Sequence, residues 1–111
     1  MNHPSNIAAL KKINKGTPFT GFLDKYFKLN QNHISKTIIA HLETDGNSYV
    51  HPSQNRSITP REAARIQSFP DWYFFTGSLR NQFKQIGNAV PPLLASVIAK
   101  EFIKILTKIN K

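Results

Sequence analysis

The feature that most constrains this chain is the tetrapeptide TPRE near its middle, because it specifies the start of a helix almost completely. Thr59 is a favourable N-cap, and Pro60 follows at the first helical position, where its missing N–H costs nothing. Glu62 can reach back to complete a capping box. We predict a helix from Pro60 to about Ser68, because Pro70 pushes the residue before it out of helical conformations.

A second group of signals, GNAVPP, indicates a helix end followed by a new helix. Ser78 can cap a short helix over LRNQFKQI, and Gly87 is expected to end it as a left-handed residue just past the last turn. Pro91 and Pro92 then open the last helix. We expect this helix to pack through an apolar stripe made of Leu93, Leu94, Val97, Ile98, Phe102, Ile105, Leu106 and Ile109.

The residues before TPRE favour a β-hairpin. The β-branched and apolar run TIIAHLE, residues 37–43, is followed by the turn dipeptide Asp45-Gly46 and by the returning run SYVH, residues 48–51. A short helix over residues 4–14 is expected to precede them. Together these patterns predict a mixed α/β fragment, with a β-hairpin followed by short helices and a long C-terminal helix.

The charge balance and the cysteine count limit the classes of function. The chain has 15 Lys and Arg against 6 Asp and Glu, a formal net charge of +9, which favours a polyanionic partner such as DNA. A basic, solvated surface without such a partner is the alternative. There is no cysteine, so this chain supplies no disulfide, no cysteine-ligated zinc and no thiol nucleophile.

The sequence carries no signal for a membrane or for secretion. No apolar run approaches the roughly 20 residues of a membrane span. The first residues lack the long apolar core of a secretory signal. We therefore expect a cytoplasmic protein with no membrane partner.

No set of residues in the sequence forms a recognisable catalytic or metal-binding constellation. The polar residues that stand out are Arg56, Arg61 and Arg65, which can position a phosphate backbone of DNA. The alternative is that Glu62 or Asp71 pairs with one arginine while another lies along the surface. The residues alone leave both interpretations open.

Two longer stretches resemble signature blocks of one enzyme family. RSITPREAARIQSFPD resembles the ninth block of the DNA (cytosine-5-)methyltransferases, and QIGNAVPPLLASVIA resembles the tenth. DKYFKL, KTIIAH, DG and YVHP are similar to the segment before the ninth block, so the resemblance covers about residues 22–103. It implies the C-terminal part of an S-adenosylmethionine-dependent methyltransferase fold.

Enzymes of that family attack a flipped cytosine of DNA with a cysteine and methylate it from S-adenosylmethionine. The family's glycine-rich cofactor loop, its Pro-Cys-Gln nucleophile, its Glu-Asn-Val and its Arg-x-Arg are absent from this sequence. The resemblance therefore implies the C-terminal portion or small subunit of such an enzyme, inactive without a chain or region that carries the missing blocks. A non-catalytic DNA-binding or interaction module derived from such an enzyme is the alternative.

The resemblance also implies roles for individual residues. The tenth block contains a loop that helps close the methionine end of the cofactor pocket, and the matching residues are Gly87, Asn88, Ala89 and Val90. The residues alone favour Asn88 as a brace for its own loop, and the resemblance implies that it would also be the foremost contact for the cofactor. The three arginines would shape the recognition lobe or lie near the DNA backbone. No residue is expected to be catalytic or to bind a metal.

By the same resemblance the chain divides into three parts. Residues 22–75 would end the target-recognition lobe, and residues 76–111 would return to the catalytic lobe with the C-terminal helix. The first part, residues 1–21, is an expected N-terminal helical segment of unknown role that the resemblance does not cover. The resemblance also suggests a prokaryotic source. Because the stripe of the last helix would be exposed in isolation, we expect the catalytic region or a second copy of the chain to cover it.

Overall fold

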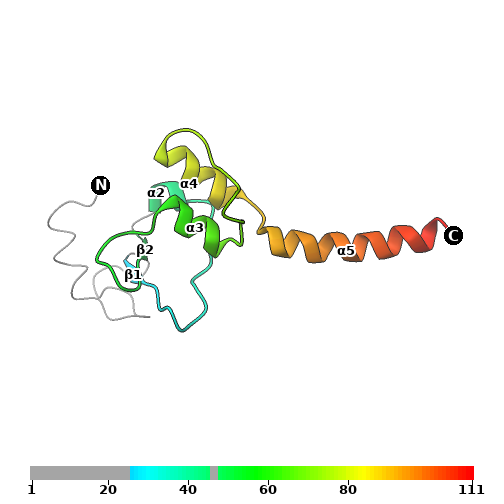
Figure 1. The fold of residues 1–111 in the computed structure, drawn as a ribbon, viewed down its shortest axis with the longest axis horizontal. Coiled ribbons are helices and arrows are strands. Elements are labelled where there is room, and N and C mark those ends of the chain that lie inside the picture. The colour runs from blue at the N-terminus through cyan, green and yellow to red at the C-terminus, as the bar shows by residue number, and fades with distance from the viewer. Residues whose placement is uncertain (1–25, 46–47) are drawn as a thin grey trace.

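The computed structural model describes residues 26–45 and 48–111, and the helix expected over residues 4–14 lies outside them. Figure 1 shows a small body of short elements from which one long helix projects. The molecule is accordingly elongated, with extents of 64 × 30 × 22 Å. In chain order the elements are β1 Phe27–Lys28, α2 Leu42–Asp45, β2 Tyr49–Val50, α3 Pro60–Ile66, α4 Leu79–Asn88 and α5 Pro92–Ile109.

The expected β-hairpin is wrong. Residues Leu42–Asp45 are helical, and β2 pairs in parallel with β1, placing Phe27 opposite Tyr49. Val50 also forms an antiparallel bridge with Ser57. Leu42 and Tyr49 are both fully buried, so packing of these side chains outweighs the local strand preference of the run before them.

Helix α3 begins as its sequence predicts. The Thr59 hydroxyl accepts from the Glu62 N–H at 3.3 Å, and a Glu62 carboxylate oxygen accepts from the Thr59 N–H at 2.7 Å. The helix ends at Ile66, earlier than expected, and the reason is not Pro70. Ser68 adopts the left-handed conformation with φ +66°, and the Phe69 N–H donates to the Ala64 carbonyl at 2.9 Å, which is a Schellman ending.

Helix α4 confirms its predicted start and corrects its predicted end. Ser78 is the N-cap, and its hydroxyl accepts from the Asn81 N–H at 3.3 Å. Gly87 lies inside the helix, which continues to Asn88. A Cβ on Gly87 would lie 2.7 Å from the Ile39 carbonyl oxygen, so glycine is required here by a close approach of backbones, and not by a left-handed turn.

The core of the small body lies where α2, α3 and α4 meet the two-stranded sheet. Its buried members are Leu29, Ile38, Leu42, Tyr49, Ile58, Ala63, Ala64 and Ile86. Phe69 and Phe75 pack against this core, and the exposed Tyr73 contacts both rings, with the three centroids 5.0 to 5.2 Å apart. Ala63 and Ala64 of α3 and Ile86 of α4 belong to the same core, which holds α4 against α3.

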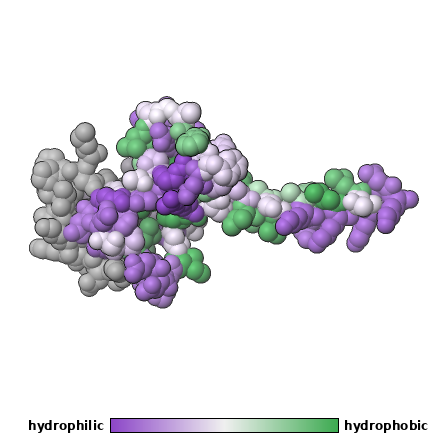
Figure 2. All heavy atoms as spheres, viewed as in Figure 1, coloured by the Kyte–Doolittle hydropathy of each residue, from purple (hydrophilic) through white to green (hydrophobic). Residues whose placement is uncertain are grey.

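Helix α5 stands apart from that core. None of its residues is buried, and the exposed fractions of Leu93, Phe102 and Ile109 are 70%, 61% and 72%. Figure 2 shows apolar side chains along its length and hydrophilic ones gathered toward the C-terminus. Among the helices of the described residues, none combines the length and the hydropathy that a membrane-spanning segment requires. The exposed stripe expected from the sequence is therefore present.

Candidate functional site

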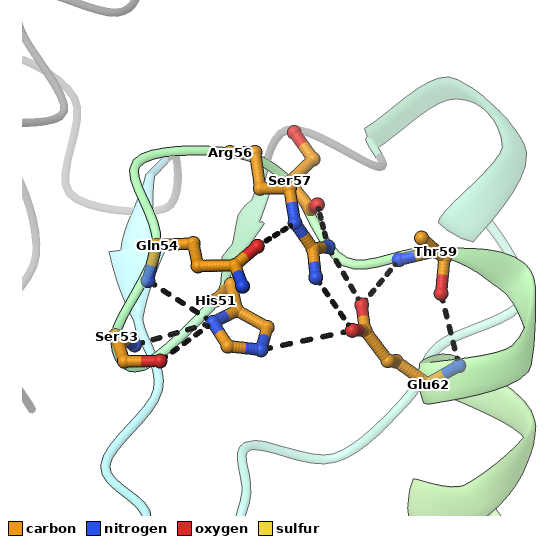
Figure 3. A network of polar contacts seen from close by, with 7 residues as sticks. All are labelled: His51, Ser53, Gln54, Arg56, Ser57, Thr59 and Glu62. Atoms are coloured by element: carbon orange, nitrogen blue, oxygen red, sulfur yellow. Dashed lines mark hydrogen bonds and ion pairs between the residues drawn. The ribbon is translucent and has the colours of Figure 1, made fainter.

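The first of the predicted arginines, Arg56, is held by an internal ion pair (Figure 3). Its two terminal nitrogens donate to the two carboxylate oxygens of Glu62 at 2.8 and 2.7 Å. The hydrogen bond from Arg56, opposed by partial burial, lowers the pKa of Glu62 to about 2. Because Glu62 also caps α3, Arg56 ties the incoming chain to the start of this helix.

The loop between β2 and Arg56 is closed by His51. Its Nδ1 accepts from the backbone N–H groups of Ser53 at 3.2 Å and Gln54 at 3.1 Å. Those two donors assign the proton to Nε2, which lies 3.6 Å from a Glu62 oxygen. Gln54 in turn accepts from Arg56. The loop, the arginine and the helix start thus form one polar network (Figure 3).

The other two arginines also have partners within the chain. Arg65 makes a bidentate pair with Asp71 at 2.8 and 2.9 Å, and both side chains are 62% exposed. The hydrogen bonds from Arg65 lower the pKa of Asp71. Arg61 donates to the Tyr73 carbonyl at 2.8 Å and lies 5.9 Å from the Phe74 ring centroid. The pairing alternative is therefore present for Arg56 and Arg65, and a DNA contact stays a prediction for all three.

A shallow hollow of about 290 Å³ lies beside the Arg56–Glu62 network. Leu29, Ile58 and Ile66 give it an apolar wall, and His51 and Arg65 lie at its edge. No cluster of three or more His, Cys, Asp or Glu residues that could hold a metal ion occurs in the part of the chain that the structure describes.

The loop predicted to close a cofactor pocket lies between α4 and α5. Asn88 is the last residue of α4 and is exposed. Its side chain makes no hydrogen bond to any described residue, so the predicted brace is not formed there. The Ala89 N–H donates to the Ile86 carbonyl at 3.3 Å, and Val90 is 60% exposed. The Asn88 amide is therefore available to an external ligand.

Two residues that sequence reasoning missed hold this loop in place. Gln67, only 7% exposed, donates from Nε2 to the Ile86 carbonyl at 3.1 Å and to the Ala89 carbonyl at 3.4 Å. The Ser68 hydroxyl accepts from the Leu93 N–H at 3.1 Å. A signal for Gln67 was present, because it follows Ala63 and Ala64 on the helix face that a core normally covers.

Comparison with known proteins gives the family. The sequence profile of the C-5 cytosine-specific DNA methylases matches residues 4–104. The type II methyltransferase M.AgeI of Thalassovita gelatinovora is 46% identical over 109 residues, covering 88% of this chain and 25% of its own length. A type II methyltransferase of Bacillus paralicheniformis is 48% identical over 81 residues, covering 71% of this chain and 18% of its own length.

A plant protein is similar as well. DNA (cytosine-5)-methyltransferase 3 of Arabidopsis thaliana is 37% identical over 91 residues, which is 80% of this chain and 6% of that protein. No solved structure matches the chain significantly. The chain spans a quarter or less of the length of these relatives. The family profile covers most of the sequence, and the chain belongs to the C-5 cytosine-specific DNA methylase family.

Proposed function

We propose that this chain is the C-terminal portion, or the small subunit, of a DNA (cytosine-5-)methyltransferase of a prokaryote. It would act with a region or second chain that supplies the cysteine nucleophile and the family's glycine-rich loop. The site of action would be the cytoplasm, where the DNA lies. The absence of cysteine supports this division, because this chain cannot form a covalent bond to cytosine through a thiol. Alone, the chain would be inactive.

The observation that carries the proposal is the uncovered stripe of α5. The helix has 18 residues and none of them is buried. Full burial of a Leu, Ile or Phe side chain stabilises a protein by about 1.5–3 kcal/mol, and most of the stability of helices in proteins comes from packing of such an apolar face. A helix that exposes so many such side chains needs a surface to pack on. In this family fragment, the missing catalytic region is the occupant that we propose.

The same proposal assigns the parts of the chain. Residues 22–75 would end the target-recognition lobe and residues 76–111 would return to the catalytic lobe, with residues 1–21 before them. Gly87, Asn88, Ala89 and Val90 would close the methionine end of the cofactor pocket. The free amide of Asn88 fits this role, because it can both donate to a carboxylate and accept from an ammonium group. S-adenosylmethionine would supply the methyl group when bound.

Complementation tests the proposal. The chain is mixed with a protein carrying the family's other blocks, and transfer of a labelled methyl group to DNA is measured. We expect transfer only from the mixture. The variant Ile98→Lys/Phe102→Lys should lose it, while Lys100→Ala, on the opposite face of α5, should keep it. The proposal is rejected if the larger protein is fully active alone and never binds this chain.

A second candidate is a non-catalytic module that binds DNA. The net charge of +9 favours it, because basic side chains release counterions from phosphates. It predicts that the isolated chain binds duplex DNA with an affinity that falls steeply as salt rises. A flat titration at low salt would exclude this candidate and would leave the subunit proposal untouched.

A further inference from the structure

We infer that Gln67 and Ser68 are a positioning pair that sets the cofactor loop, residues 87–90, and the direction of α5. This inference rests on the proposed function, because it takes that loop to face the cofactor. Neither residue needs to touch the cofactor or DNA. Both act on the backbone on either side of the loop, from the C-terminal end of α3.

Gln67 holds the end of α4. Its side chain is buried, and its Nε2 donates to the carbonyls of Ile86 and Ala89 at 3.1 and 3.4 Å. The last carbonyls of a helix lack partners within the helix, so a buried amide that supplies two donors fixes where the helix ends. Asn88 lies between Ile86 and Ala89 in the chain, and it is exposed. Its amide therefore projects from a backbone that Gln67 anchors.

Ser68 holds the start of α5. Pro91 and Pro92 have no N–H, so Leu93 carries the first free amide of that helix, and Ser68 accepts from it at 3.1 Å. Ser68 occupies the left-handed region at φ +66°, where glycine or asparagine fits better. The Schellman ending of α3 places Ser68 in this conformation, and its hydroxyl then reaches the Leu93 N–H. Here the hydroxyl caps a helix that belongs to a different part of the fold.

The two contacts come from adjacent residues and enclose a short linker. Helix α4 ends at Asn88 and α5 begins at Pro92, so only residues 89–91 join them. By the proposed division of the chain, α3 belongs to the recognition lobe, and α4 and α5 belong to the catalytic lobe. The Gln67–Ser68 pair is thus the place where α3 sets the geometry of the cofactor loop.

The test uses Gln67→Met, which keeps the length of the side chain without its donors, and Ser68→Gly, which suits the left-handed backbone and removes the hydroxyl together with Cβ. In the complemented enzyme we expect each to raise KM for S-adenosylmethionine about three- to tenfold, with kcat within about twofold, because Gln67→Met loses both hydrogen bonds to the end of α4 and Ser68→Gly loses the hydrogen bond to α5. Ser68→Asn keeps a left-handed preference and an oxygen acceptor, so it should restore KM. Unchanged KM in both variants would overturn the inference, as would a loss confined to kcat.

A second measurement separates this inference from the proposed function. In the isolated chain, NMR should show faster hydrogen exchange at the Leu93 amide in Ser68→Gly and unchanged exchange at the Ala63 amide of α3. If the wild-type mixture has no methyl-transfer activity, the proposed function fails, and the exchange rates still decide whether Ser68 holds α5. Equal exchange at Leu93 in both proteins would show that it does not.

Discussion

Both terminal nitrogens of Arg56 lie within 2.8 Å of the two carboxylate oxygens of Glu62, the residue that completes the capping box of α3. One carboxylate therefore receives the Arg56 guanidinium and the Thr59 N–H together. The side chain of Glu62 is 27% exposed. An ion pair shielded to this degree is more than a solvated surface contact, and it joins the β2 loop to the helix start.

The first prediction concerns the pH dependence of stability. The pKa of Glu62 is lowered from 4.5 to about 2, so the folded chain holds this carboxylate ionised more strongly than the unfolded chain does. Its contribution is present above pH 4.5 and is lost as pH falls toward 2. We expect Glu62→Gln to lower the free energy of unfolding at pH 7 by about 2 kcal/mol, after allowance for partial exposure.

Urea unfolding at pH 7, 4 and 2.5 measures this effect. The difference between wild type and Glu62→Gln should shrink across the series, because acid removes the same charge from the wild-type protein. Asp71→Asn is the control, since Asp71 and Arg65 form a solvent-exposed ion pair. A gap for Glu62→Gln that stays constant with pH would contradict the assignment.

Local signals in the sequence were sufficient wherever an element is decided by its own neighbours. The starts of α3 and α4 follow from Thr59 and Ser78, whose side chains bond to N–H groups one turn away. The expected hairpin between residues 37–43 and 48–51 does not form. Strand β2 pairs instead with β1, which lies more than twenty residues upstream. Such pairings depend on tertiary packing, which no turn dipeptide reports.

In the candidate site too, local signals identify some residues and tertiary packing decides others. Asn88 could be singled out because it is part of the motif GNAVPP, and the structure leaves its amide free of described partners. The burial of Gln67 could be predicted from its place on the helix face of Ala63 and Ala64, but the partners of Gln67 and Ser68 could not, since Ile86, Ala89 and Leu93 lie 19 to 25 residues further along the chain. Gly87 was expected to adopt a left-handed conformation. Glycine is instead required there because a side chain would collide with the backbone of Ile39.

The second prediction follows from that close approach. In Gly87→Ala the new methyl group would meet the backbone oxygens of Ile39 at 2.7 Å and Ala40 at 3.1 Å. Backbone atoms cannot swing aside as a flexible side chain can, so α4 must shift from its place. We expect a loss of about 1–3 kcal/mol in the free energy of unfolding, measured by thermal and urea denaturation.

Asn88→Ala is the matched control for Gly87→Ala. The side chain is exposed and without described partners, so stability should change by less than about 0.5 kcal/mol. If Asn88 contacts the cofactor as proposed, the complemented enzyme should instead show a raised KM for S-adenosylmethionine. A stable variant with wild-type KM would remove Asn88 from the proposed pocket.

The third prediction separates the folding of the chain from its docking. Phe102 is 61% exposed and Ile98 45%, so Ile98→Lys/Phe102→Lys should leave the unfolding midpoint of the small body nearly unchanged. The wild-type chain should self-associate at high concentration through the same stripe, and the variant should not. Light scattering over a concentration series measures this. A wild-type chain that stays monomeric throughout would show that the stripe is covered in solution by the chain itself.

The last prediction tests whether Arg65 contacts DNA. Its guanidinium is paired with Asp71 on the surface, where a phosphate could replace the carboxylate at little cost. If it does, Arg65→Gln should weaken binding of a labelled duplex by the complemented enzyme and lower the slope of log affinity against log salt by about one. Asp71→Asn removes the competing carboxylate and should strengthen the same binding. If the pair is purely structural, loss of either partner should weaken DNA binding alike. Opposite effects of the two substitutions on DNA affinity therefore assign Arg65 to the DNA backbone.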